Sequence, residues 1–191
     1  MMIFQSSTQK SEKQSAISLY LQVVRENCLN PSSLAALASA QKDMLEKRKD
    51  GDLYTLRPEF RHQFKVVLTG GVFDVIHPGH LHTLREAKKH GDVLVVVVAT
   101  DKTVQERKNV QPMHNQNERA ELVDALKPVD LAIVGASDWK TTLERVSPDV
   151  VVFGYDQTEM KLPSNIQVVK LTTHGANPDS KTGKVRERLG L

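Results

Sequence analysis

The feature of this sequence that most constrains its fold is an unbroken apolar run, DVLVVVVAT, at residues 92–100. A strand with one face in water would alternate apolar and polar residues, so this run is typical of a strand buried on both faces of a parallel sheet. Shorter apolar runs repeat the pattern: KVVLTG (65–70), VDLAIVG (129–135), DVVVFG (149–154) and IQVVKL (166–171). Stretches with helical spacing separate them. This alternation predicts an α/β fold, a doubly wound parallel sheet of about five strands.

Helices are expected between these strands. The segment 81–92 has apolar residues on one helical face and ends at Gly91, a residue typical of helix C-caps. Further helices are expected at 117–126, which opens with Asn117 as a cap, at 137–148, which ends with a proline, and at 181–189. In such Rossmann-like sheets, ligands bind beyond the carboxyl ends of the strands. The loops expected at that edge are 70–80, 100–116, 135–138, 154–165 and 172–182.

The first 63 residues have a different composition and form a mainly helical extension. An amphipathic helix is expected at 15–29, one or two more at 30–49, and a hairpin signal, Asp-Gly, opens the segment 50–60. Helices followed by a hairpin fit a small winged-helix-like module, and a helical appendage that packs on the core or on a second subunit is the alternative. We therefore expect an extension at 1–63 and a second domain at 64–191.

Composition limits the class of protein. The 191 residues carry a net charge of +3, which suits small anionic ligands and does not require nucleic acid. The single cysteine, Cys28, excludes an internal disulfide framework and agrees with a reducing compartment. The longest apolar run is far shorter than the ~20 residues that span a bilayer, and the N-terminus lacks the apolar core of a signal peptide. The chain is expected to be cytoplasmic.

The segment TGGVFDVIHPGH, at 69–80, concentrates the residues suited to chemistry. A strand is expected to end at Thr69, glycines let the backbone approach a ligand, and a helix is expected to start near Gly79. The N–H groups and dipole of a helix start favour an anion. His77 and His80 could both point at one phosphate there. Their arrangement suits attack on the α-phosphate of a nucleotide, where fixed donors stabilise the charge that develops.

Two other interpretations of this segment stay open. His82 makes three histidines in six residues, which could indicate a zinc site, although a fourth ligand is not evident. Alternatively, the segment is a turn in which histidines are incidental. The position of the segment between the first strand of the sheet and a helix favours the phosphate site.

Several stretches resemble a known family. GGVFDVIHPGHLHTLREAKKHGD resembles the signature of the nucleotidyltransferase superfamily with the His-x-Gly-His motif, and residues from about 64 to 189 resemble its small cytidylyltransferase-like branch. Within that branch, ATDKTVQERK, NERAELVDALKPVD and PDVVVFGYDQ are most similar to archaeal FAD synthases, which are related to glycerol-3-phosphate cytidylyltransferase.

The resemblance implies roles for matching residues. His77 and His80 would stabilise the transferring phosphate, Lys108 would contact substrate and phosphate together with Asp101, and Arg119 would hold the loop or the phosphates. The nucleotide would be bound by residues of the histidine loop and of the loop after the fourth strand: Thr69, Gly70, Gly71, Val72, Phe73, Asp74, Gly79, Gly154, Tyr155, Asp156 and Gln157. Family members use Mg²⁺, which would enter on the nucleotide phosphates rather than in a protein metal site.

One stretch departs from the family pattern. A Ser/Thr-rich motif usually precedes the final helix, but here the sequence reads DSKTGKVRERL. Thr182 is the expected nucleotide contact there, beside Ser180. Lys181 and Lys184 add positive point charges, which bind phosphate with a different geometry from that of hydroxyl groups. This leaves a changed substrate or a reduced activity open.

The expected function is transfer of AMP or CMP from a nucleoside triphosphate to a phosphate-bearing acceptor, with release of pyrophosphate. FMN with ATP is the first choice of substrates, and a polyol phosphate such as glycerol 3-phosphate with CTP is the second. A homodimer is expected. A hypothesis of another class is a nucleotide-sensing regulator in which residues 1–63 bind DNA.

Overall fold

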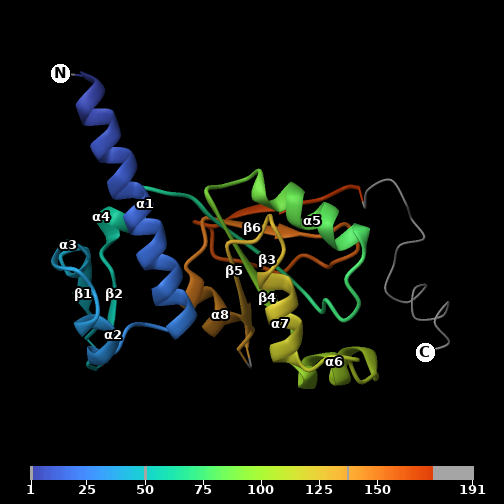
Figure 1. Ribbon diagram of the computed structural model, residues 1–191. Coiled ribbons are helices and arrows are strands. Elements are labelled where there is room, and N and C mark those ends of the chain that lie inside the picture. Colours follow the sequence, from blue (N-terminus) through green and yellow to red (C-terminus); the bar gives the residue numbers. More distant parts are fainter. Residues whose placement is uncertain (1, 50, 137, 174–191) are drawn as a thin grey trace. The chain divides into compact units, whose positions relative to one another are not determined.

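The computed structural model describes residues 2–49, 51–136 and 138–173. The chain divides into two compact units, Met1–Phe64 and Lys65–Leu191 (Figure 1). Each unit has its own buried residues. Within the described part of the chain, no helix is both long and apolar enough to cross a membrane.

The first unit is mainly helical, with one hairpin. Its elements are α1 (Met2–Glu26), α2 (Pro31–Ala35), α3 (Ser39–Lys42), β1 (Leu45–Lys47), β2 (Tyr54–Leu56) and α4 (Pro58–Arg61). Helix α1 buries a stripe with the spacing i, i+3, i+4, i+7 and i+8, formed by Ala16, Leu19, Tyr20, Val23 and Val24. The predicted helical extension is thereby confirmed.

The hairpin of this unit differs from the expectation at one point. Residues 45–47 were expected to be helical, but they form strand β1, antiparallel to β2. Leu45 lies opposite Leu56, and both are buried, so a period of two governs this short segment. Leu29 adds a bridge to Tyr54 on β2, with N···O distances of 3.0 and 2.9 Å. The segment after α1 therefore joins the hairpin as an additional paired residue.

The second unit contains the expected parallel sheet. Its strands are β3 (Val66–Gly71), β4 (Val93–Val98), β5 (Leu131–Val134), β6 (Val150–Phe153) and β7 (Gln167–Lys170). They lie in the order β5-β4-β3-β6-β7, and every pairing is parallel. The order reverses at β3, so the switch point, where ligands bind in such sheets, lies between the carboxyl ends of β3 and β6. The predicted fold class is confirmed.

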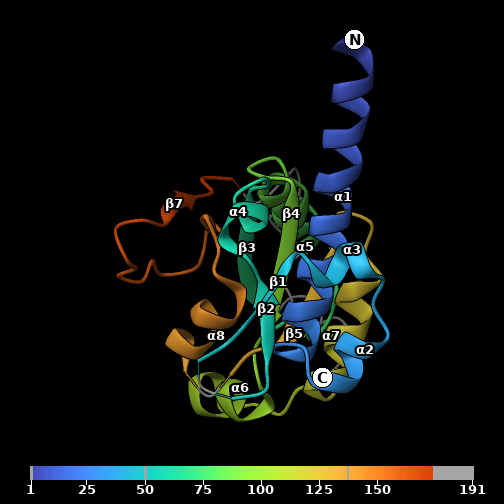
Figure 2. The same cartoon turned by 90° about the vertical axis from the view of Figure 1, so that its left-hand side faces the viewer.

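Helices cover both faces of this sheet (Figure 2). They are α5 (Pro78–Lys88), α6 (Asp101–Lys108), α7 (Gln116–Asp124) and α8 (Trp139–Val146). One face packs against α5 and α7 in a core of buried residues: Val67, Phe73, Leu84, Ala87, Leu94, Val96, Val98, Val123, Val150 and Val152. The alternate strand residues point to the other face, where Gly70 and Val97 lie near Trp139 of α8.

Three local expectations need correction. The expected loop 100–116 contains helix α6, capped by the Thr100 side chain, which accepts from the Thr103 N–H. The cap of helix α7 is Asn115, two residues before the expected cap Asn117. Helix α5 ends at a right-handed cap, so Gly91 is not its cap. A Cβ at Gly91 would lie 2.7 Å from the Lys65 carbonyl oxygen, which gives this glycine a steric reason instead. The expected helix at 181–189 lies outside the described residues.

Candidate functional site

The two histidines of the signature lie together at the start of α5. His77 is the N-cap residue, and the Gly79 N–H donates to its Nδ1 at 3.2 Å. This bond requires Nδ1 to be unprotonated, so a neutral His77 carries its proton on Nε2. The His77 and His80 rings stack with a centroid distance of 3.9 Å and an interplanar angle of 28°. The helix start therefore presents two imidazoles side by side next to the switch point.

Both imidazoles are held in the neutral form. Burial lowers the pKa of His77, and the charge of Asp156 opposes this shift. Burial lowers the pKa of His80 to about 3, and the charges of His77 and Lys108 act in the same direction. The two rings are therefore neutral hydrogen-bonding groups at physiological pH. In the described part of the chain, His80 Nδ1 is buried without a hydrogen-bond partner, which leaves it able to bond to a ligand.

The backbone before the histidines is tightly constrained. Phe73 has a φ of +53° and is buried against the core, a conformation that costs energy for an aromatic residue and often marks a functional loop. Its ring covers Gly71 so closely that a Cβ there would lie 2.9 Å from a ring carbon. The ring also contacts His80, at 5.0 Å between centroids. Gly71 and Phe73 together therefore support the His80 ring.

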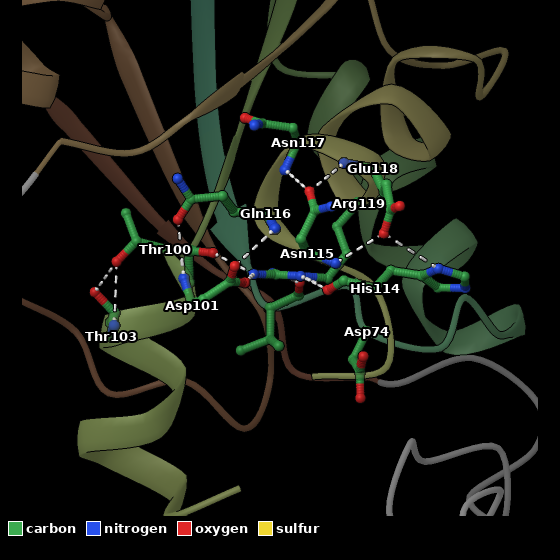
Figure 3. Close-up of polar contacts among 12 residues, drawn as sticks. Asp74, Thr100, Asp101, Thr103, His114, Asn115, Gln116, Asn117, Glu118 and Arg119 are labelled. Atoms are coloured by element: carbon green, nitrogen blue, oxygen red, sulfur yellow. Dashed lines mark hydrogen bonds and ion pairs between the residues drawn. The ribbon is translucent and has the colours of Figure 1, made fainter. Parts of the chain in front are cut away.

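Arg119 joins the loops around this site (Figure 3). Its side chain is fully buried. It donates to the carbonyls of Val72, Ala99 and His114, and to Asp101 Oδ1 at 2.6 Å. These partners come from the loops after β3 and β4 and from the segment before α7. Of the two roles expected for Arg119, this geometry favours holding the loops over contacting phosphate.

Asp101 is engaged in the same network. Its Oδ1 accepts from Arg119, its Oδ2 accepts from the Gln116 N–H at 3.2 Å, and its own N–H donates to Gln116 Oε1 at 3.0 Å. Asp101 therefore joins the starts of α6 and α7, and substrate binding is not needed to explain it. Gln116 was not singled out in the sequence, because its only signal is its place beside the Asn115 cap.

Asp74 has a similar structural partner. It is buried, and its Oδ1 accepts from the Met113 N–H at 2.6 Å. This bond attaches the segment before α7 to the histidine loop. Asp74 thus fixes loop geometry close to the histidines, and this bond accounts for its place in the loop without a contact to the nucleotide.

A second set of contacts closes the switch point. The Gln157 side chain donates to the Gly70 carbonyl at 2.6 Å and accepts from the Gly154 N–H at 2.8 Å. The Thr69 hydroxyl donates to the Val152 carbonyl at 2.8 Å, and the Lys170 ammonium donates to the Gln157 carbonyl. Hydrogen bonds from side chains to backbone groups therefore connect the carboxyl ends of β3, β6 and β7.

The remaining expected residues are placed as follows. Asp156 is exposed in the loop after β6 and close enough to His77 to affect its pKa. Tyr155 is half-buried beside it. Lys108 is exposed at the end of α6, and its charge reaches His80. Thr182 lies outside the described residues.

The zinc interpretation finds no cluster to support it in the residues that the structure describes. There, no group of three or more His, Cys, Asp or Glu side chains could hold a metal ion. His82 turns from the other two histidines to Thr173, with 3.3 Å between Nε2 and Oγ1.

Comparison with known proteins agrees with this geometry. The family model described as cytidylyltransferase-like matches residues 68–176. The FAD synthase of Thermoplasma acidophilum is 43% identical over 138 residues, which are 65% of this chain and 96% of the relative. The FAD synthase of Thermococcus sibiricus is 38% identical over 134 residues, 64% of this chain and 90% of the relative.

A solved structure agrees as well. The lipopolysaccharide core biosynthesis protein of Thermoplasma volcanium is 37% identical, with a TM-score of 0.51 over 56% of this chain and 96% of that one. These matches confirm the expected nucleotidyltransferase superfamily and enzyme class. The chain therefore belongs to the cytidylyltransferase-like family.

Proposed function

We propose that this chain is an FAD synthase-like enzyme that transfers AMP from ATP to the phosphate of FMN and releases pyrophosphate. The observation that carries the proposal is the stacked, neutral pair His77 and His80 at the start of α5, beside the switch point of the sheet. The identity of 38–43% with FAD synthases supports FMN and ATP as the substrates.

The proposed reaction needs positioning and charge stabilisation. A phosphate oxygen of FMN attacks the α-phosphorus of ATP, the bond from that phosphorus to the β-phosphate oxygen breaks, and pyrophosphate leaves. The attacking phosphate is already ionised, so the mechanism needs neither a general base nor a covalent intermediate. The Nε2–H of His77 and the His80 ring would bond to oxygens of the α-phosphate, and Lys108 would add positive charge.

Mg²⁺ would be expected on the triphosphate, where it neutralises charge on the phosphates. The carboxylates of Asp74 and Asp101 already accept hydrogen bonds within the loops. Asp156 is the residue that we would expect to help hold the ion, because its carboxylate is exposed beside His77.

The direct test is product formation by the full-length protein. Incubation with ATP, FMN and Mg²⁺ should yield FAD and pyrophosphate in equal amounts, separated by chromatography. CTP with glycerol 3-phosphate, run in parallel, tests the cytidylyltransferase alternative. If neither pair gives pyrophosphate while nucleotides still bind, the enzymatic proposal fails.

A second candidate function concerns residues 1–63. Helices α1 to α3, the bridge at Leu29 and the hairpin β1–β2 follow one another in the order expected of a winged-helix-like module. Lys47, Arg48 and Lys49 are exposed on that hairpin. We propose duplex DNA as the ligand of this module, in a regulator that senses nucleotides. A gel shift that weakens steeply with salt would support this; the absence of any shift at low salt would refute it.

A homodimer is part of the proposal as well. Sedimentation equilibrium of the full-length protein tests it, and a single species of 21.3 kDa at micromolar concentration would contradict it.

A further inference from the structure

The loop after β6 begins with a tight turn at residues 154–157, which read GYDQ. The backbone N–H of Gln157 donates to the Gly154 carbonyl at 3.1 Å, which closes the turn. Its side-chain carbonyl accepts from the Gly154 N–H at 2.8 Å, and its side-chain amide donates to the Gly70 carbonyl at 2.6 Å. Its backbone carbonyl accepts from the Lys170 ammonium. Each of the four polar groups of Gln157 therefore helps to hold this turn in place.

Lys170 is the charged partner in this set, and it has no assigned role. It is the last residue of β7, at the edge of the five-stranded sheet, and it pairs with Phe153 of β6. A lysine on an edge strand usually extends into water. Here the side chain is half-buried, and its ammonium turns to the Gln157 carbonyl. A hydrogen bond from a charged donor is about twice as strong as one between neutral groups, so Lys170 is a strong anchor for the end of the turn.

The anchored turn borders the site of the histidines. Its Gln157 side chain joins the carboxyl ends of β3 and β6, on either side of the switch point. Between its two fixed ends the turn carries Asp156, which is exposed and close enough to His77 for its charge to act on the pKa of that ring. The place of Asp156 relative to His77 therefore depends on how firmly Gln157 is held, and Lys170 contributes to that hold from β7.

We propose that Lys170 is a positioning residue for the nucleoside triphosphate: its ammonium fixes the turn 154–157, and the fixed turn keeps Asp156 beside His77. This rests on the proposed function, in which the nucleotide lies at the switch point. Lys170 acts through Gln157 and does not itself contact the nucleotide. A turn that is fixed before the ligand arrives loses little conformational freedom on binding, so the nucleotide binds more tightly.

The first test observes the turn without a ligand. Amide hydrogen exchange of the full-length protein, followed by NMR, reports the N–H groups of Gly154 and Gln157, which are both bonded within the turn. In Lys170→Met, which removes the ammonium, these two groups should exchange roughly 10-fold faster, whereas those of β4 should keep their rates. Unchanged exchange in the turn would show that Lys170 does not hold it, and that result overturns the inference. Faster exchange throughout the second unit would indicate a general loss of stability and also overturns it.

The second test measures nucleotide binding. Titration calorimetry with a non-hydrolysable ATP analogue and Mg²⁺ should give a Kd that is ~10-fold higher for Lys170→Met than for the wild-type protein. Lys170→Arg keeps a charged donor and should restore most of the affinity. Lys161→Met removes an exposed positive charge from the same loop and is the matched control, with an unchanged Kd. Equal losses of affinity in Lys170→Met and Lys161→Met would mean that only the overall charge matters, which refutes the inference.

Both measurements are independent of turnover, so they separate this inference from the proposed function. If the wild-type protein binds the ATP analogue but forms no FAD, the proposed function fails, and the exchange rates and Kd values still decide the role of Lys170. If the wild-type protein does not bind the analogue at all, the inference about Lys170 fails.

Discussion

At the scale of single residues, His77 and His80 combine a hydrogen-bonding role with a resistance to protonation. The stacked rings are 3.9 Å apart, so a positive charge on one would oppose a charge on the other. Burial is the first cause of the lowered pKa of both rings, and the charge of His77 adds to it for His80. Neutral rings suit a site that must accept a nucleotide over a wide range of pH.

Replacing His80 tests its proposed contact with the phosphate. His80→Ala should lower the rate of FAD formation by ~10²-fold or more, because one donor to the developing charge is lost. His90→Ala, near the far end of the α5 segment, is the matched control and should leave the rate unchanged. Steady-state kinetics with ATP and FMN measure both variants, and an unaffected rate in His80→Ala would remove this residue from the mechanism.

The depressed pKa of His80 predicts a pH effect on stability. The folded chain keeps His80 neutral down to a pKa of about 3, whereas the unfolded chain protonates it near the ordinary value of 6.5. Between these values the unfolded state binds more protons, so the free energy of unfolding should fall as pH drops from about 6.5 toward 3. In His80→Gln this fall should be smaller. Urea unfolding at pH 6.5 and 4.5 measures the free energy of unfolding of the wild-type protein and of His80→Gln. If this free energy falls equally in both proteins, the argument from the burial of His80 is wrong.

Arg119 carries a prediction about the loops. A lysine cannot reach three carbonyls and a carboxylate at once, so Arg119→Lys should lower the free energy of unfolding by about 2–4 kcal/mol. FAD formation should fall too, because the loops around the histidines lose their common anchor. Arg107→Lys, exposed on α6, is the control. Urea unfolding and the rate of FAD formation, measured on the same preparations, test this prediction. An Arg119→Lys variant with wild-type stability and wild-type activity would argue against the anchoring role.

The roles of these residues could be predicted from the sequence to different extents. The histidine pair could be found because its position between a strand and a helix places it at the site. For Arg119 the family resemblance offered two roles, holding the loop or the phosphates, and the sequence could not choose between them because the anchoring depends on carbonyls up to 47 residues away, such as that of Val72.

At the scale of elements, the parallel strands are the best predicted part. Continuous apolar runs are typical of strands buried on both faces of a parallel sheet, and all five strands lie within one or two residues of the expected ranges. Helix α6 was missed because only Val104 of its eight residues is buried, which leaves no apolar stripe to detect. Strand β1 was missed because three residues are too few to show a period of two.

The turn between α5 and β4 carries an element-scale prediction. Gly91→Ala should lower the free energy of unfolding by about 1–3 kcal/mol, because its Cβ would lie 2.7 Å from the Lys65 carbonyl oxygen. Gly154→Ala is the matched control for stability, since its Cβ would meet its neighbours at an ordinary 3.6 Å. Chemical unfolding of both variants tests the difference, and equal stabilities would show that the turn relaxes freely.

At the scale of the whole molecule, the functions of the two units can be tested separately. The family match begins at residue 68 and so lies entirely in the second unit. The sequence indicated the boundary through a change of composition near residue 64. It could not decide what the first unit does, because a small helical module with a hairpin fits several kinds of partner.

Ligand binding should therefore protect one unit selectively. With a saturating ATP analogue and Mg²⁺, hydrogen exchange should slow at the carboxyl end of β3 and at the start of α5, since binding stabilises the folded state of the part it contacts. Residues 1–64 should exchange at unchanged rates. Comparable slowing in both units would show that the first unit takes part in nucleotide binding.

The way in which Arg119 is anchored has a consequence for how such an enzyme changes over evolution. Three of its four partners are main-chain carbonyls, those of Val72, Ala99 and His114. A carbonyl is present whatever side chain the residue carries, so these positions can mutate while the loops keep their paths. Descendants of one ancestor could therefore acquire new acceptors by exchanging side chains on an unchanged framework.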